Sequence, residues 1–406
     1  MAGSNLGDSI RKEAGKIVLV FQGGGALGAY QAGVYHAMHE AGIEPDWIIG
    51  TSIGAINASL IAGNAPADRL GALQEFWNRV THKAPWQDWP LLMPFAQPFL
   101  YWSILNSGLS SFFEPNPVAF LGPHVHLGED AAGYYSTAPL KATLSSLIDE
   151  NRLNDGSMRL TVGAAEVRTS LMRYFDTKQE RLDVRHVMAS GALPPAFPAV
   201  RIDGELYWDG GILSNTPTEI VFDDYPRHDS LVFAVHMWNP VGAEPTNIWE
   251  VMHRQKDIQY SSRVASHIAR QKELQKLRHI IEELSEYVPN VDQQREIVKE
   301  MISYGCPTRM HVVRLLAPSL DAEDQTKDVD FSASGIRARW QAGYEHARHA
   351  IASGPWRGSF DPLDGVILHE PSYANIAASK RRSDGATSQV QSSNPAAPLN
   401  GTVAVS

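Results

Sequence analysis

Residues 17–28 read Ile-Val-Leu-Val-Phe-Gln-Gly-Gly-Gly-Ala-Leu-Gly, an apolar run that ends in a cluster of glycines. A continuous apolar run of this length is typical of a strand buried on both faces of a parallel sheet. Residues 26–41 then carry apolar side chains at helical spacing, and Gly42 supplies a helix stop. Residues 47–49 form a second short apolar run, which leads through 50–54 into another apolar helix. This order of strand, helix, strand, helix predicts an α/β sheet with crossover helices.

The composition narrows the class of protein. Of 406 residues, 43% are hydrophobic and 20% are charged, which indicates a globular body. The 35 basic and 45 acidic residues leave a formal charge of −10, which argues against nucleic acid as a partner. Cys306 is the only cysteine, so an internal disulfide is excluded and a reducing, cytoplasmic location is expected. Residues 1–16 lack the pattern of a secretory signal, and no apolar stretch approaches the ~20 residues of a membrane span.

The chain divides into segments of different character. Further strands are predicted at 159–167 and 171–175 (a hairpin), 205–208, 231–237 and 309–316. Apolar residues at helical intervals predict a helical arm or hairpin at 248–287 and a helix at 332–353. We therefore predict four parts, namely a flexible N-terminus (1–15), an α/β domain (16–240) that carries the motifs described below, a mainly helical C-terminal extension (241–360) and a disordered tail (378–406).

The pentapeptide Gly50-Thr51-Ser52-Ile53-Gly54 matches Gly-x-Ser-x-Gly between a predicted strand and a predicted helix. A serine on so sharp a turn has strained dihedrals, and side chains in place of Gly50 and Gly54 would collide. Its hydroxyl would be exposed at a helix N-terminus, where the backbone dipole favours developing negative charge. Ser52 is therefore a candidate nucleophile.

Gly23, Gly25 and Gly28 have the spacing Gly-x-Gly-x-x-Gly after the first strand. A dinucleotide-binding loop has this spacing, but it requires an acidic residue after the second strand, which here ends in Thr-Ser. Alternatively, the amides of Gly24 and Gly25 converge on the place where an oxyanion would form above Ser52. A tight turn without a ligand is the third interpretation.

A hydroxyl needs a base before it becomes a good nucleophile. Asp209 follows a predicted strand and precedes Gly210 and Gly211, so it could take the proton directly or simply belong to a turn. His186 and His236 lie near predicted element ends without a local signature, which favours structural roles.

Four blocks taken together resemble the patatin-like phospholipase family, and they occur in the family's order at 23–28, 50–54, 189–198 and 209–211. The resemblance covers about residues 17–240 and implies a three-layer α/β fold, a mainly parallel sheet flanked by helices. It implies a lipid acyl hydrolase with a Ser-Asp dyad and no cofactor. One departure is Leu27, where many members carry Arg or Lys. The implied site comprises the nucleophile Ser52, the general base Asp209, the oxyanion hole Gly23, Gly24 and Gly25, and the supporting Gly28, Gly50, Gly54, Gly210 and Gly211.

Several alternatives stay open at this point. A nicotinamide-dependent enzyme and a non-catalytic lipid-binding or interaction protein compete with the hydrolase. Residues 84–113 interleave prolines and aromatics, which could line an acyl channel, contact a lipid surface or only pack. His124 and His126 with nearby acids could share a metal ion, although a solvated loop without metal is the favoured interpretation. The expected partners are a lipid or acyl ester, a bilayer surface contacted peripherally, and a second copy of the chain through its helical C-terminal region.

Overall fold

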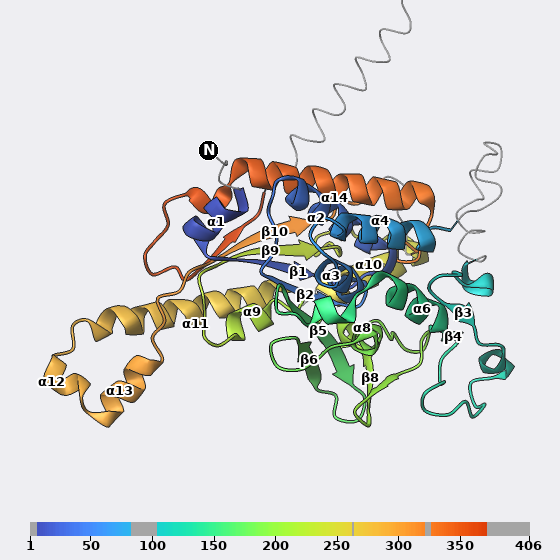
Figure 1. The fold of residues 1–406 in the computed structure, drawn as a ribbon, viewed down its shortest axis with the longest axis horizontal. Coiled ribbons are helices and arrows are strands. Elements are labelled where there is room, and N and C mark those ends of the chain that lie inside the picture. Colours follow the sequence, from blue (N-terminus) through green and yellow to red (C-terminus); the bar gives the residue numbers. More distant parts are fainter. Residues whose placement is uncertain (1–5, 83–103, 262–263, 321–325, 372–406) are drawn as a thin grey trace, which may run out of the picture. The chain divides into compact units, whose positions relative to one another are not determined.

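A computed structural model describes residues 6–82, 104–261, 264–320 and 326–371. Up to His369, the described residues belong to one compact unit built around a nine-stranded sheet (Figure 1). The strand order is β11-β10-β9-β1-β2-β5-β8-β7, with β6 paired to β5. The strands of this sheet are β1 (Lys16–Phe21), β2 (Trp47–Thr51), β5 (Arg159–Glu166), β6 (Met172–Asp176), β7 (Val200–Ile202), β8 (Glu205–Asp209), β9 (Ser230–His236), β10 (Met310–Leu316) and β11 (Val366–His369).

The sheet is mixed but mostly parallel, as the sequence predicts. Strands β11, β10, β9, β1, β2 and β5 pair in parallel. Strands β6 and β8 pair antiparallel to β5, and β7 pairs antiparallel to β8. The predicted hairpin after residue 159 is confirmed by the β5–β6 pair. A separate two-stranded ladder joins β3 (Glu114–Pro115) to β4 (Tyr135–Ser136).

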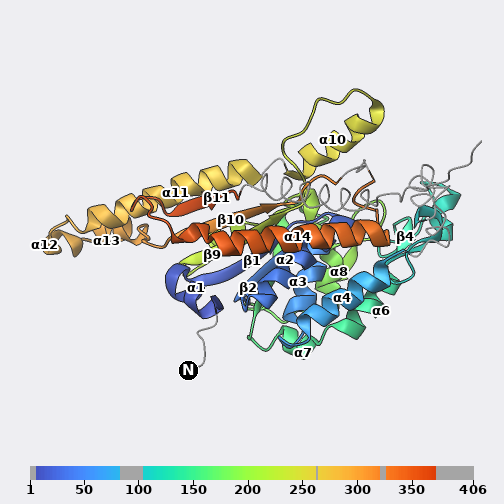
Figure 2. The same ribbon diagram turned by 90° about the horizontal axis from the view of Figure 1, so that it is seen from above.

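Helices cover both faces of the sheet, with α2 and α14 on one face and α9 and α11 on the other (Figures 1 and 2). The α-helices are α1 (Leu6–Ala14), α2 (Ala29–Glu40), α3 (Ile53–Ala62), α4 (Arg69–Val80), α6 (Ala138–Leu147), α7 (Glu150–Leu153), α8 (Val184–Ser190), α9 (Glu219–Asp223), α10 (Ile248–Ser261), α11 (Val264–Ser285), α12 (Asn290–Gln293), α13 (Glu296–Ser303) and α14 (Ala333–Ser353). A 3₁₀ turn, η1 (Gly25–Gly28), connects β1 to α2. This arrangement of helix, sheet and helix layers confirms the predicted fold class.

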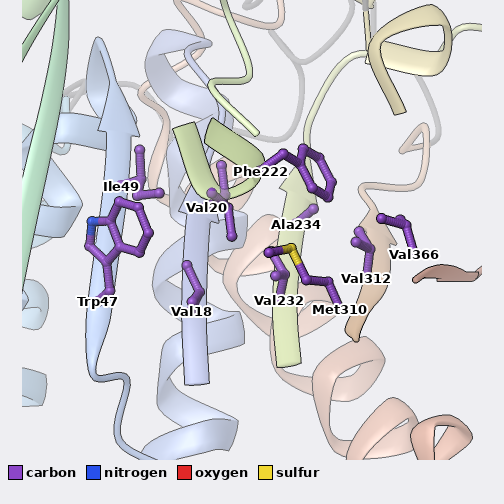
Figure 3. Close-up of a cluster of buried hydrophobic side chains, with 11 residues drawn as sticks. Val18, Val20, Trp47, Ile49, Phe222, Val232, Ala234, Met310, Val312 and Val366 are labelled. Carbon is purple, nitrogen blue, oxygen red and sulfur yellow. The ribbon is translucent and has the colours of Figure 1, made fainter. Parts of the chain in front are cut away.

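The core under α9 follows from the alternation of side chains along each strand. Val18 and Val20 of β1 point to the same face as Val232 and Ala234 of β9, and Phe222 of α9 packs on them (Figure 3). Equivalent positions of β10 and β11 extend this cluster. Because these strands are buried on both faces, their sequences read as unbroken apolar runs.

Residues 310–316, 333–353 and 366–369 belong to the same compact unit. Strands β10 and β11 extend the sheet beyond β9. Helix α14 lies against α2 so closely that a Cβ on Gly33 would collide with the Trp340 carbonyl, and one on Gly343 with the Tyr30 carbonyl. The boundary that we predicted at residue 240 therefore does not separate two compact units, although the helical C-terminal region itself is present.

The N-terminus differs from the prediction of a flexible segment over 1–15. Residues 6–14 form α1, because Ile10 is fully buried and Arg11 bonds the Asp46 carboxylate and the Glu44 carbonyl. The predicted tail at 378–406 lies outside the described residues. Within the described residues, no helix is both long and apolar enough to cross a bilayer.

Candidate active site

Ser52 lies on the sharp turn between β2 and α3. Its φ of 57° and ψ of −128° are rare for a residue with a side chain. A Cβ on Gly50 would collide with the backbone of Gly54, and one on Gly54 would lie 2.5 Å from the Phe21 carbonyl oxygen. The two glycines flanking Ser52 are thus required by the tight passage from strand to helix. The strained turn presents the Ser52 side chain to a cavity.

A buried serine on α8 holds this turn in place. The Ser52 N–H donates to Ser190 Oγ at 2.9 Å, and Ser190 Oγ donates to the Gly163 carbonyl of β5 at 2.6 Å. Ser190 is fully buried. The amide of Ser52 is therefore committed to structure and does not face a substrate.

Asp209 reaches Ser52 through the register of three neighbouring strands. Thr51 of β2 pairs with Gly163 of β5, and the next residue, Ala164, pairs with Asp209 of β8. Two side chains separated by more than 150 residues thus meet at one edge of the sheet.

The Asp209 carboxylate is 2% exposed and accepts the Gly211 N–H at 2.7 Å. Burial raises its pKa from 3.8 to about 6, and hydrogen bonds from the Ser52 side chain and the Gly211 amide limit this rise. The carboxylate is therefore a stronger base than an exposed aspartate, and the Ser52 side chain lies close enough to lower its pKa.

The glycine loop after β1 presents two unpaired amides. Among the described residues, the N–H groups of Gly24 and Gly25 have no hydrogen-bond acceptor, whereas the Gly23 N–H donates to the Asn215 carbonyl at 3.1 Å. The Gly23 N–H is therefore not available to a substrate. Of the three residues predicted to form the oxyanion hole, only Gly24 and Gly25 offer an available N–H. Gly25 has a φ of 54°, and a Cβ there would collide with the Asp328 carbonyl oxygen.

Hydrogen bonds to the Gly23 carbonyl fix the orientation of the Gly24 amide, which belongs to the same peptide group. The Gly23 carbonyl accepts from Trp238 Nε1 at 2.8 Å and from Asn215 Nδ2 at 3.1 Å. Because the trans peptide is planar, its carbonyl and the following N–H point in opposite directions. Holding the Gly23 oxygen therefore turns the Gly24 N–H away from Trp238 and Asn215.

Gln22 anchors the loop where it leaves β1. Its fully buried amide donates to Thr216 Oγ1 at 2.7 Å and to the Tyr260 carbonyl at 3.1 Å, and its oxygen accepts from the Trp238 N–H at 3.1 Å. Sequence reasoning missed Gln22 and Trp238, and it gave Ser190 no role beyond membership of the block at 189–198, because each acts through contacts with distant segments. The only local signal is a polar Gln22 directly after a buried strand.

A cavity of about 180 Å³ opens from Ser52 and Asp209. Its other walls are mostly aromatic and aliphatic, and they come from Ile53, Ile56, Leu105, Phe112, Phe113, Tyr135, Leu193, Ala196, Phe197, Trp238, Tyr260, Val329 and Phe331. A space of this kind accepts an apolar chain and excludes water. Of the aromatic segment at 84–113, residues 83–103 lie outside the described part, and the remainder supplies three cavity residues.

The weaker sequence candidates lie elsewhere. His186 joins the cap of α8 through Asp183, and neither His186 nor His236 lines the cavity. Within the described residues, no group of three or more His, Cys, Asp or Glu side chains could hold a metal ion. Glu129 and Asp130, beside the predicted histidine pair, bond to Arg201.

In the described residues, the end of the second strand offers the dinucleotide interpretation no acidic partner. Glu44 and Asp46 precede β2, at the end of the strand opposite to Ser52. They pair with Arg69 and Arg11. The structure thus gives the glycine loop no ribose-binding acid from the second strand.

Comparisons with known proteins identify the family of this chain. The family described as patatin-like phospholipase matches residues 19–222, and one described as patatin phospholipase matches 258–363. Lysophospholipase nte1 of Aspergillus terreus is 54% identical over 78 residues, 16% of this chain and 5% of that protein. Human patatin-like phospholipase domain-containing protein 6 is 25% identical over 205 residues, 50% of this chain and 12% of that protein.

Rat patatin-like phospholipase domain-containing protein 7 is 27% identical over 208 residues, again 50% of this chain and 12% of the relative. This chain thus spans only a small part of the length of these relatives. Among solved structures, VipD of Legionella pneumophila is 15% identical with a TM-score of 0.38, over 93% of this chain and 76% of VipD. The family match covers half of the sequence and includes Ser52 and Asp209, so the chain belongs to the patatin-like phospholipase family.

Proposed function

We propose that this protein is a serine acyl hydrolase that cleaves carboxylic esters of lipids through a Ser52–Asp209 dyad. The family supports hydrolysis of a lipid. The observation that carries the finer proposal is that Ser52 and a buried carboxylate of raised pKa line the same apolar cavity.

In the first half-reaction, Asp209 accepts the Ser52 proton while Oγ attacks the ester carbonyl carbon. The amides of Gly24 and Gly25 bind the oxyanion that forms. Asp209 then returns the proton to the departing alkoxide, which leaves as an alcohol, and the acyl group stays on Ser52.

In the second half-reaction, a water molecule gives a proton to Asp209 and attacks the acyl-enzyme. Collapse of this second tetrahedral intermediate returns the proton to Ser52 Oγ and releases the fatty acid. The raised pKa of Asp209 serves both steps, because a general base is most effective with a pKa near the working pH. Histidine has no part in this scheme.

The test combines a covalent probe with substitutions. We expect a fluorophosphonate to label Ser52, and both Ser52→Ala and Asp209→Asn to lose nitrophenyl ester hydrolysis by at least about a thousandfold. Ser303→Ala, at an exposed serine of α13, is the matched control and should retain labelling and rate. Wild-type rates in either dyad variant, or folded protein without a label, would contradict the dyad. Absence of a label would favour the non-catalytic lipid-binding alternative.

Peripheral contact with a lipid surface is a further part of the proposal. Ile248, Trp249 and Met252 of α10 are 72%, 62% and 46% exposed. The same helix carries Tyr260, which lines the cavity. We expect the protein to sediment with neutral phosphatidylcholine vesicles and Trp249→Ser to sediment less. Unchanged sedimentation of that variant would contradict this contact.

Pairing of two chains through residues 241–360 and a cytoplasmic location stay predictions. Analytical ultracentrifugation tests the pairing, and cell fractionation tests the location.

A further inference from the structure

The segment 326–331, between β10 and α14, reaches the glycine loop from the far end of the chain. It lies outside the 19–222 family match and within the 258–363 match. The Asp328 carbonyl accepts the Ala26 N–H at 2.8 Å, directly after the unpaired Gly25 amide. Asp328, Val329 and Phe331 all line the cavity.

Two ion pairs fasten this segment to α10. Lys327 Nζ lies 2.8 Å from Asp257 Oδ1, and these two side chains are 4% and 7% exposed. Lys256 Nζ lies 2.7 Å from Asp328 Oδ1. A buried charge is costly unless it is paired, so the Lys327–Asp257 pair disfavours any displacement of the segment.

Phe331 forms part of the cavity wall alongside α3. Its ring stacks on Trp77 at a centroid distance of 6.4 Å and lies 6.0 Å from Phe112. Trp77 Nε1 in turn donates to Asn57 Oδ1 at 3.0 Å. Asn57 is five residues past Ser52, about 7 Å along the helix at 1.5 Å per residue. Phe331 lines the same cavity as Ser52, Ile53 and Ile56, so its ring is part of the wall that an acyl chain on Ser52 would meet.

We propose that residues 326–331 are part of the acyl-binding site and that Phe331 and Val329 determine the length of the acyl chain accepted. This assignment rests on the proposed hydrolase activity. It gives the C-terminal region a direct role in catalytic specificity. Each methylene that the cavity buries improves relative kcat/KM about fourfold, so the position of this wall sets the preferred chain length.

The experiment compares kcat/KM for nitrophenyl esters of four to fourteen carbons. Phe331→Ala removes the ring that bounds the cavity, and we expect the ratio of long-chain to short-chain kcat/KM to rise at least about tenfold. Val329→Phe fills the same space, and its ratio should fall by a similar factor. Phe331→Leu retains more of the packing and replaces Phe331→Ala in the experiment if the Ala variant fails to fold. Its ratio of long-chain to short-chain kcat/KM should also rise.

Phe360→Ala is the matched control, because Phe360 lies in the same C-terminal region, packs on His311 and His369, and does not line the cavity. Its chain-length profile should equal that of the wild type. The assignment would be overturned if Phe360→Ala changed the ratio of long-chain to short-chain kcat/KM as Phe331→Ala does. Unchanged ratios in the folded Phe331 and Val329 variants would also overturn it. In either case Ser52 would still be labelled, so the proposed function would stand. If the wild type hydrolyses no ester and takes no label, the proposed function fails, and this assignment fails with it.

Discussion

Replacing Asp209 with asparagine measures how much the buried negative charge of Asp209 lowers the stability of the folded protein. Burial raises the pKa of this carboxyl from 3.8 to about 6. At 1.36 kcal/mol per pKa unit, this difference corresponds to about 3 kcal/mol of destabilisation when the group is ionised. Asparagine has the same shape and no charge, and its Oδ1 can still accept the Gly211 N–H. Because the bonds from Ser52 and Gly211 weaken on losing the charge, we expect Asp209→Asn to raise the free energy of unfolding by about 1–3 kcal/mol at pH 8.

The pH dependence gives the sign of this effect. Below pH 3.8 the carboxyl is protonated in both the folded and the unfolded wild type, so its burial carries no charge penalty. Between 3.8 and about 6 the folded state binds more protons, so this group lowers wild-type stability as pH rises. The advantage of the asparagine variant should therefore be largest above pH 6 and about half as large at pH 5.

Urea unfolding followed by tryptophan fluorescence at pH 5 and pH 8 measures both values. Asp176→Asn is the control, because Asp176 is also buried but bonds Arg159 Nε at 2.9 Å and Thr161 Oγ1 at 2.8 Å. It should lose about 1–3 kcal/mol, since Arg159 loses this charged partner and keeps Asp224 at 2.9 Å. A stability difference for Asp209→Asn that is negative at pH 8, or equal at the two pH values, would refute the reasoning.

Three further predictions concern catalysis. With ionised Asp209 as the base, kcat/KM should fall about tenfold per pH unit below about 6, and a rate that is flat from pH 5 to 8 would contradict this role. Ser190→Ala removes the acceptor of the Ser52 N–H, so kcat on a butyrate ester should fall about 10- to 100-fold with KM little changed. An unchanged kcat would show that the turn keeps its conformation without Ser190. Trp238→Phe removes the donor to the Gly23 carbonyl, and a similar fall in kcat, measured with the same ester, is expected from the loosened oxyanion loop.

The fold was predictable where local signals agreed. The apolar runs of β1 and β9, the helical spacing of α14 and the glycines around Ser52 each point to the element that forms there. Strand β11 escaped notice because it has four residues near the end of the described chain, and its partner β10 begins 56 residues earlier. Helix α1 was missed because its buried residues, Gly7, Ile10 and Ala14, include only one large apolar side chain in an otherwise polar segment.

Within the site, residues inside short motifs were identifiable and their supports were not. Ser52 and Asp209 stand in recognisable blocks, and their meeting follows from the pairing of β2, β5 and β8. Ser190 also lies in such a block, at 189–198, but its role is not evident until its hydroxyl is found between Ser52 and Gly163. Side chains that act through the backbone of distant segments leave no spacing pattern, so the sequence alone could not separate them from core residues.

The basicity of Asp209 depends on parts of the chain that the catalytic motifs do not include. Its raised pKa comes from burial, and Tyr260 of α10 is close enough that burial and the neighbouring Asp209 charge raise the pKa of its own hydroxyl. The same helix holds the segment 326–331 through Asp257, and that segment supplies one wall of the cavity. Water reaching Asp209 would return its pKa toward 3.8, where a carboxylate is a poor base for a hydroxyl. In the proposed mechanism, the C-terminal region would therefore contribute to the chemistry as well as to the fold, because its residues line the same cavity as Asp209.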